Sequence, residues 1–215
     1  LRSAGELRTK EEDEIFMAFE AENRSDLLIF TDKCNLYKSH VYEFTDTKPG
    51  DLGHFLRSEL GMDADETPVF MISTQDYKGL FFVAFEHGKA ARFPISAYET
   101  KQNRKKLVNA YYDGSKAVGF LLLSEDEDPD LVVTNNVDKA AVFKSSLIPL
   151  KTTRTTQGVQ LLASKKGSIL KSLNRLEELD VTDPEYYRIR KVPAIGYYIR
   201  EKSLEAKQIS FDDMN

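Results

Sequence analysis

Lys-Ala-Ala-Arg-Phe at residues 89–93 returns fifty residues later as Lys-Ala-Ala-Val-Phe at residues 139–143. A short apolar run rich in β-branched or aromatic residues precedes each copy, at residues 80–83 and 131–133. Asn, Asp and Gly lie between run and copy, and these residues tolerate the positive φ that tight hairpins require. Because each run is too short for a typical helix, both pieces are predicted to be β-hairpins.

A third hairpin of the same kind is predicted near the start of the chain. The apolar run at residues 27–30 leads through a turn into a second strand at residues 36–38. Gly88 and Asp138 occupy equivalent turns in the later copies, and Cys34 lies at the matching place here. Cys34 is therefore interpreted as a turn residue.

Four strands per unit and a period near fifty residues are typical of a β-propeller, in which radial repetition protects the edges of small sheets. More strand is expected after each hairpin, at residues 41–44, 95–98 and 147–150. The predicted fold is all-β, a propeller of about four to five four-stranded blades. A β-sandwich whose hairpins resemble one another by accident is the alternative.

The repeats divide one domain, residues 1–215, into successive units. The expected limits are 1–27 for a partial first blade, 28–79, 80–130 and 131–182 for complete blades, and 183–215 for a closing tail. The partial blade should end in a strand at residues 14–19. The chain begins at a leucine and is interpreted as a piece of a longer protein.

Four phenylalanines that recur with the period are expected in the core: Phe30, Phe82, Phe93 and Phe143.

The formal net charge is −5, which by itself disfavours nucleic-acid binding, because DNA affinity comes largely from Lys and Arg neutralising phosphates. The charges are segregated, however. Residues 89–116 hold seven bases and two acids, and residues 138–171 hold seven bases and one acid. Such stretches can form a basic face on an acidic molecule. The acidic run at residues 125–130 is expected to be a solvated loop.

Several classes of function are disfavoured. A single cysteine allows no internal disulfide and fits a reducing compartment. The three histidines and the cysteine lack the paired spacing of a structural zinc site, and no triad pattern surrounds them. No apolar run approaches the roughly 18 residues of a membrane span. The acids lie mainly in loop runs, whereas a propeller glycosidase needs paired carboxylates in a central cavity.

The ordered segments also resemble a known family. The strand and turn at residues 27–33, the pair Tyr37-Lys38 and the segment 41–44 resemble the repeat in the C-terminal domain of the DNA gyrase A protein. Residues 152–159 are similar to the Arg-Thr-Ala-x-Gly-Val stretch that follows in that family. The resemblance covers residues 1–175 and rests on the order and spacing of the segments.

This resemblance, to the bacterial type II topoisomerases gyrase and topoisomerase IV, implies a β-pinwheel, a propeller whose blades exchange strands. It implies that a basic outer rim binds double-stranded DNA without sequence preference, bends it, and presents it to the N-terminal cleavage core of the same chain. The separate ATPase protein of these enzymes is a further implied partner, and a membrane is not. The domain itself is expected to be no enzyme and to hold no cofactor, since the parent's cleavage tyrosine, ATP and Mg²⁺ lie elsewhere. The implied location is the bacterial cytoplasm, at the nucleoid.

The chain departs from the family pattern at its N-terminus. Gyrase carries a Gln-Arg-Arg-Gly-Gly-Lys-Gly box in its first blade, which is associated with tight DNA wrapping. The matching residues 1–8 keep one glycine and little else. The resemblance therefore puts gyrase-like wrapping in doubt and leaves gyrase and topoisomerase IV activities both open for the parent protein.

Phosphate contacts are expected mainly in the basic loops that follow the hairpins. The predicted DNA-binding residues are Lys101, Arg104, Lys105, Lys106, Lys151, Arg154, Lys165, Lys166, Arg92, Lys38 and Lys48. Tyr111 and Tyr112 are interpreted as packing residues rather than base-stacking groups. The alternative function is a propeller scaffold for protein–protein interaction, which predicts no salt-dependent affinity for DNA.

Overall fold

The computed structural model describes residues 15–48, 51–100, 104–163, 167–200 and 204. Backbone contacts group the chain into two compact units. The first comprises Leu1–Asp76, Gln102–Val108 and Ile209–Asn215, and the second comprises Tyr77–Lys101 and Asn109–Gln208. The first unit holds one β-sheet and the second holds two.

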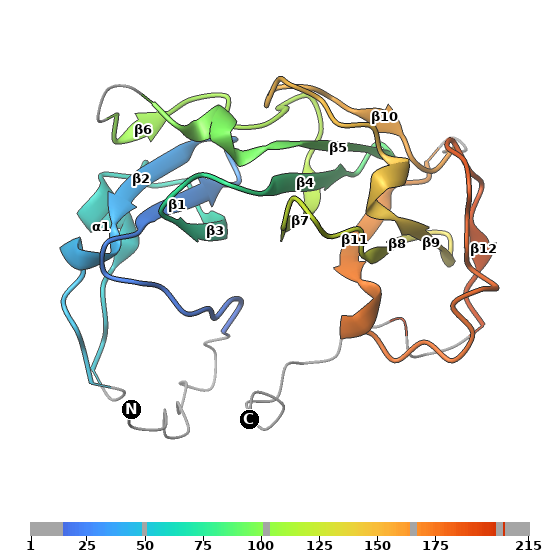
Figure 1. The fold of residues 1–215 in the computed structure, drawn as a ribbon, viewed down its shortest axis with the longest axis horizontal. Helices are drawn as coiled ribbons and strands as arrows, with labels where there is room; N and C mark the ends of the chain where they lie inside the picture. Colours follow the sequence, from blue (N-terminus) through green and yellow to red (C-terminus); the bar gives the residue numbers. More distant parts are fainter. Residues whose placement is uncertain (1–14, 49–50, 101–103, 164–166, 201–203, 205–215) are drawn as a thin grey trace. The chain divides into compact units, whose positions relative to one another are not determined.

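The sheet of the first unit is antiparallel, with the strand order β3-β1-β2-β6 (Figure 1). Its strands are β1 (Asp26–Thr31), β2 (Leu36–His40), β3 (Pro68–Thr74) and β6 (Lys106–Leu107). The predicted hairpin is β1–β2, and β3 pairs with β1 while β6 pairs with β2. The short helical elements are η1 (Val41–Glu43) and α1 (Leu56–Leu60).

The second unit contains two further four-stranded antiparallel sheets, with the strand orders β10-β5-β4-β7 and β11-β8-β9-β12. The strands of the first are β4 (Leu80–Phe85), β5 (Lys89–Pro94), β7 (Ala117–Leu123) and β10 (Val159–Gln160). Those of the second are β8 (Asp130–Asn135), β9 (Lys139–Lys144), β11 (Leu170–Arg175) and β12 (Tyr197–Tyr198). Three single turns of 3-10 helix complete the unit: η2 (Ile95–Tyr98), η3 (Ser145–Leu147) and η4 (Leu176–Glu178).

An outer strand of the second unit comes from beyond the next hairpin. β10 follows the β8–β9 hairpin along the chain, yet it pairs with β5, with Val159 opposite Ala90. β12 takes the same position on the other sheet, with Tyr197 opposite Ala140 of β9. Successive repeats are therefore linked by strand pairing as well as by sequence.

The tight turns form as the sequence predicts. Cys34, Gly88 and Asp138 all have positive φ, of 58°, 89° and 54° respectively. The two non-glycine residues adopt a conformation that costs an L-residue free energy, so the surrounding hairpins must impose it. The interpretation of Cys34 as a turn residue is thus confirmed.

Two groups of expected strands are wrong. Of the segment expected at 147–150, Leu150 forms an isolated bridge with Arg92. The segments expected at 41–44 and 95–98 turn as η1 and η2, and Leu147 ends the turn η3. Each closes with a backbone hydrogen bond between residues three apart, which bends the chain out of its sheet. The strand expected at residues 14–19 is also not formed: residues 15–19 have no regular structure, and Ile15 and Phe16 are exposed.

The core confirms the predicted phenylalanines. Phe30, Phe82, Phe93 and Phe143 are all fully buried. In the second unit one apolar cluster joins both sheets, and the rings of Phe82 and Phe143 lie 6.3 Å apart, centre to centre. β7 lies against β11, where a Cβ on Gly119 would come within 2.6 Å of Leu173 Cβ. None of the helices in the described ranges is long and apolar enough to cross a membrane.

Replacing Gly158 by alanine should strongly destabilise the second unit. A Cβ at this position would lie 1.9 Å from the carbonyl oxygen of Ala90 on β5. The loop around residue 158 would therefore have to move away from β5. We expect a loss of at least about 2 kcal/mol in the free energy of unfolding, measured by urea denaturation. Gly167 also has positive φ, but an added Cβ would meet no atom of the described residues within 4 Å, so Gly167→Ala should cost only about 1 kcal/mol. Equal losses in the two variants would contradict the close packing of this loop.

Candidate nucleic-acid interface

Two predicted contact residues lie exposed beside the outer strand of the first unit. Arg104 and Lys105 directly precede β6, and both are exposed. The carbonyl oxygen of Lys105 accepts a hydrogen bond of 2.8 Å from the backbone N–H of Lys38 on β2. The backbone of this segment is thus held against the sheet while the two cationic residues stay accessible to solvent. Lys101 lies outside the described residues.

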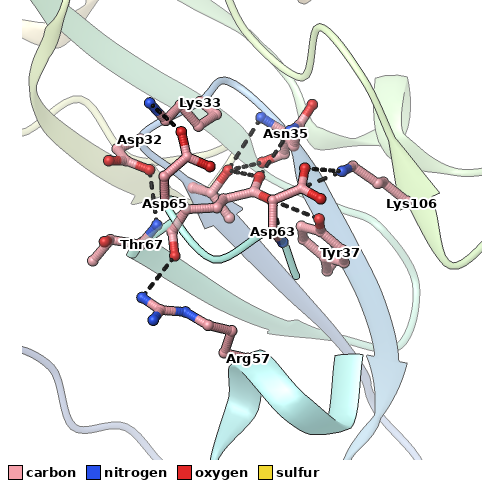
Figure 2. Close-up of polar contacts among 11 residues, drawn as sticks. Asp32, Lys33, Asn35, Tyr37, Arg57, Asp63, Asp65, Thr67 and Lys106 are labelled. Atoms are coloured by element: carbon pink, nitrogen blue, oxygen red, sulfur yellow. Dashed lines mark hydrogen bonds and ion pairs between the residues drawn. The ribbon is translucent and has the colours of Figure 1, made fainter. Parts of the chain in front are cut away.

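Lys106, the next predicted contact, is engaged by the protein itself (Figure 2). Its ammonium lies 3.2 Å from a carboxylate oxygen of Asp63 and 3.8 Å from one of Glu66. It also lies over the ring of Tyr37, 5.0 Å from the centre. The hydrogen bond with Tyr37, then that with Asp63, raises the pKa of Lys106 above its ordinary value. Lys106 thus has a structural role, and its contact with DNA stays a prediction.

Glu66 is the centre of this network, and its side chain is completely buried. One carboxylate oxygen accepts hydrogen bonds from the Thr31 hydroxyl at 2.5 Å and the Asn35 amide at 2.8 Å. The other accepts a hydrogen bond of 2.6 Å from the Tyr37 hydroxyl. The donors all belong to the β1–β2 hairpin or its turn, so Glu66 ties the segment before β3 to that hairpin.

The electrostatics of Glu66 follow from these partners. Burial disfavours the charged carboxylate, but the hydrogen bonds from Thr31, Tyr37 and Asn35 favour it, as does the charge of Lys106. The balance lowers the pKa of Glu66 below its ordinary value. A buried, ionised carboxylate of this kind is stable only while its partners remain in place.

Further hydrogen bonds hold the segment that carries Glu66. Asp32 and Thr67 exchange two: Asp32 N–H donates to the Thr67 carbonyl at 3.0 Å, and Thr67 N–H donates to the Asp32 carboxylate at 2.8 Å. The Arg57 guanidinium donates to the Glu66 carbonyl at 3.1 Å (Figure 2). The network therefore fixes backbone as well as side chains.

The second predicted loop, residues 150–158, crosses β5 in the second unit. The Lys151 N–H donates to the Arg92 carbonyl at 2.8 Å. The Arg154 guanidinium donates to the carbonyls of Asn109 at 3.1 Å and Ala97 at 3.2 Å. Arg154 is half-buried and anchors the loop, a role that the sequence did not reveal.

The remaining predicted contacts are scattered. Arg92 is half-buried on β5, where burial lowers its pKa and its Nε has no hydrogen-bond partner among the described residues. Lys48 is exposed, whereas Lys165 and Lys166 lie outside the described residues. Arg104 and Lys105 belong to the first unit, and Lys151 and Arg154 belong to the second. A continuous basic rim therefore stays a prediction.

The acidic run at residues 125–130 is more than the solvated loop that we expected. The Arg175 guanidinium donates to both carboxylate oxygens of Glu127, at 2.7 and 3.1 Å. Arg188 binds Asp130 in the same way, at 2.7 and 3.2 Å. These hydrogen bonds lower the pKa of Glu127 and that of Asp130. Part of the protein's negative charge is thus neutralised within the fold.

Sequence reasoning missed one basic segment of the second unit. Residues 186–200 contain four bases and no acid, and Arg190 and Lys191 among them are exposed. A charge count over this window would have found the segment, which has no visible sequence repeat.

Tyr111, interpreted as a packing residue, is confirmed as buried, and Tyr112 stacks on His87.

Comparison with known proteins supports the resemblance seen in the repeats. No protein-family model matches the chain. It is 25% identical over 175 residues to the DNA gyrase A protein of Streptomyces coelicolor, an alignment that covers 78% of this chain and 20% of that protein. The chain thus spans about a fifth of the length of this relative.

Three solved structures share the fold. The C-terminal domain of DNA topoisomerase IV superposes with a TM-score of 0.68 at 22% identity, covering 80% of this chain and 54% of that one. The E. coli ParC C-terminal domain gives 0.68 at 12% identity, with coverages of 94% and 87%. The DNA gyrase A C-terminal domain gives 0.59 at 18% identity, with coverages of 82% and 60%. The resemblance predicted from the hairpin repeats is confirmed.

Replacing Glu66 by glutamine should cost stability in a pH-dependent way. The pKa of Glu66 is lowered in the folded protein, so its carboxylate stabilises the fold above the ordinary pKa of about 4.3, and this is lost as the pH falls through the folded value. At pH 7 we expect Glu66→Gln to reduce the free energy of unfolding by about 2–4 kcal/mol, because Lys106 and three donors lose their ionised acceptor.

Urea denaturation at pH 7 and at pH 3 checks this expectation. The difference between wild type and Glu66→Gln should shrink at the lower pH, whereas the exposed Glu20→Gln should match wild type at both. An equal loss for Glu66→Gln at the two pH values would show that Glu66 is not ionised in the fold.

Proposed function

We propose that this chain is the DNA-binding C-terminal domain of the DNA-cleaving protein of a bacterial type II topoisomerase, the counterpart of gyrase A. It binds duplex DNA without sequence preference through a basic outer rim, bends it, and delivers it to the cleavage core. The observation that carries the proposal is the fold shared with the C-terminal domains of topoisomerase IV and gyrase A, together with exposed cations beside the outer strands.

Phosphate neutralisation on an acidic protein is feasible because the acids and bases play different parts. Glu66, Glu127 and Asp130 are held by internal hydrogen bonds and ion pairs. Arg104 and Lys105 are exposed on their loop. The exposed cations can therefore meet an anionic backbone while these three carboxylates are held within the fold.

The complete architecture that we propose is a β-pinwheel, a ring of about four to five blades. The three four-stranded sheets and the pairing of β10 with the preceding repeat support it. In such a ring the loops before the outer strands lie on the rim, and contacts to successive phosphates bend the duplex without reading its bases.

The activities of the whole protein belong to the same proposal. The parent chain would carry the cleavage core, pair with a separate ATPase protein, and use ATP and Mg²⁺ outside this domain, in the bacterial cytoplasm. The domain by itself would catalyse no reaction. Residues 1–8, at the place of the gyrase box, lie outside the described residues and keep one glycine of that motif. We therefore propose weak wrapping, as in a topoisomerase IV or a divergent gyrase.

DNA binding by the 215-residue chain should depend steeply on salt. If about four phosphates are neutralised, the slope of log affinity against log salt concentration should be about −3.6, so a roughly fourfold rise in salt weakens binding about a hundredfold. Changing Arg104 and Lys105 together to alanine should flatten the slope by about 1.8 units, one contact for each residue. Affinity should be similar for two duplexes of unrelated sequence, because phosphate contacts carry no base information.

The control for this salt series removes the same charge elsewhere in the first unit. Arg24 and Lys33 are both exposed, and changing them to alanine should leave the slope near the wild-type value. A wild type without salt-dependent affinity would refute the proposal in favour of a protein-binding scaffold. A ligation assay on plasmid DNA should in addition find little writhe introduced by the domain.

A further inference from the structure

The loop at residues 188–196 begins and ends at the same positions on its sheet as the loop at residues 150–158, one repeat earlier. Leu150 bridges Arg92 in parallel orientation, and Arg188 bridges Val142 in the same way. Arg92 and Val142 are the fourth residues of the two Lys-Ala-Ala-x-Phe segments, so they are equivalent positions. Each loop therefore starts at the same place on its sheet.

The two loops also end at the same place. Gly158 and Gly196, each eight residues after the bridging residue, have φ of 73° and 74°. The nearest contact of an added Cβ is the carbonyl oxygen of Ala90 at Gly158, and that of the equivalent Ala140 at Gly196. The residue after each glycine then begins the outer strand, β10 or β12. Equal length and equal register at both ends make loop 188–196 the positional equivalent of loop 150–158.

The two loops differ in which side chain anchors them to the fold. In the earlier loop Arg154 is the anchor, and the positions before it hold Thr152 and Thr153. In the later loop the residue equivalent to Arg154 is Val192, which packs against the apolar core of the unit. The positions before it hold Arg190 and Lys191, and both are exposed. An apolar anchor thus leaves both cations of this loop facing solvent.

Within the described residues, the acids near the two cations are engaged by another cation, Arg188. The nearest acid along the chain is Glu185, which binds Arg188 with a separation of 2.5 Å, and Arg188 also holds Asp130. No ion pair of Arg190 or Lys191 occurs among the described residues. Both line a groove of about 830 Å³ that also includes Pro193, Ile195 and Tyr197. Glu185 and Arg188 line the same groove and pair with each other, so the unpaired charge of its described lining is positive.

We propose that Arg190 and Lys191 bind phosphates of duplex DNA, as an additional contact point of the domain. This rests on the function proposed above and adds a site in a segment whose sequence shows no repeat. Its carrying observation is the equivalence of the two loops, combined with two exposed cations at the positions that hold Thr152 and Thr153 in the earlier loop. Guanidinium and ammonium groups at an exposed loop are the groups that contact the DNA backbone.

The experiment compares salt dependence in the double variant Arg190→Gln with Lys191→Gln. Against wild type, its slope of log affinity on log salt should be flatter by about 1.8 units, and its affinity at about 0.1 M salt should fall roughly tenfold or more. The control, Arg24→Gln with Lys33→Gln, removes the same charge from exposed positions of the other unit, where Lys33 pairs with Asp65, and should leave the slope unchanged. Equal thermal unfolding midpoints for the variants would exclude an effect through folding.

The outcomes separate the two proposals. If wild type binds DNA and the Arg104 and Lys105 variant weakens binding, a wild-type slope in the Arg190 and Lys191 variant overturns the present inference alone. The loop would then face another partner, such as a protein. A flattening no larger than that of the control would overturn it as well. If wild type does not bind DNA at all, the proposed function is refuted, and this inference is refuted with it.

Discussion

The pairing of a two-residue outer strand with a preceding hairpin is the contact on which the candidate interface depends. β6 on β2, β10 on β5 and β12 on β9 are each only two residues long. So short a strand contributes few hydrogen bonds, which individually add only about 1 kcal/mol of net stability. Side-chain anchors therefore hold the adjoining loops: Lys106 on Glu66, Arg154 on two carbonyls, and Val192 in the core.

The same anchors explain how an acidic protein can present basic surfaces. Carboxylates such as Glu66, Glu127 and Asp130 are used inside the fold, each held by a cation or by hydroxyl and amide donors. Cations that are not needed as anchors remain outside, as Arg104, Lys105 and Arg190 do. Net charge is thus a poor guide to the face that a partner meets, because the field depends on where the charges lie.

The sequence predicted the repeated hairpins, their turns and the buried phenylalanines, because periodic apolar runs and turn residues act locally. The prediction failed where tertiary contacts determine the local structure or the role of a side chain. Val41–Glu43 turn as 3-10 helix, closed by the hydrogen bond that the Phe44 N–H donates to the Val41 carbonyl. The role of Glu66 as a buried acceptor could not be read from the sequence, because Glu66 stands beside the acids Asp63 and Asp65 and lies 29 residues from Tyr37. Loop 188–196 shares only its final glycine with loop 150–158, so its equivalence appears through strand register.

Acetylation of surface lysines with and without a saturating duplex, read by mass spectrometry, tests most directly whether the outer loops are a DNA-binding surface. Lys105, Lys151 and Lys191 lie on loops beside outer strands, whereas Lys33 lies in the β1–β2 turn. DNA should protect the three loop lysines and leave the modification of Lys33 unchanged. Equal modification of the loop lysines in the presence and absence of DNA, or protection of Lys33 instead, would contradict DNA binding by these loops.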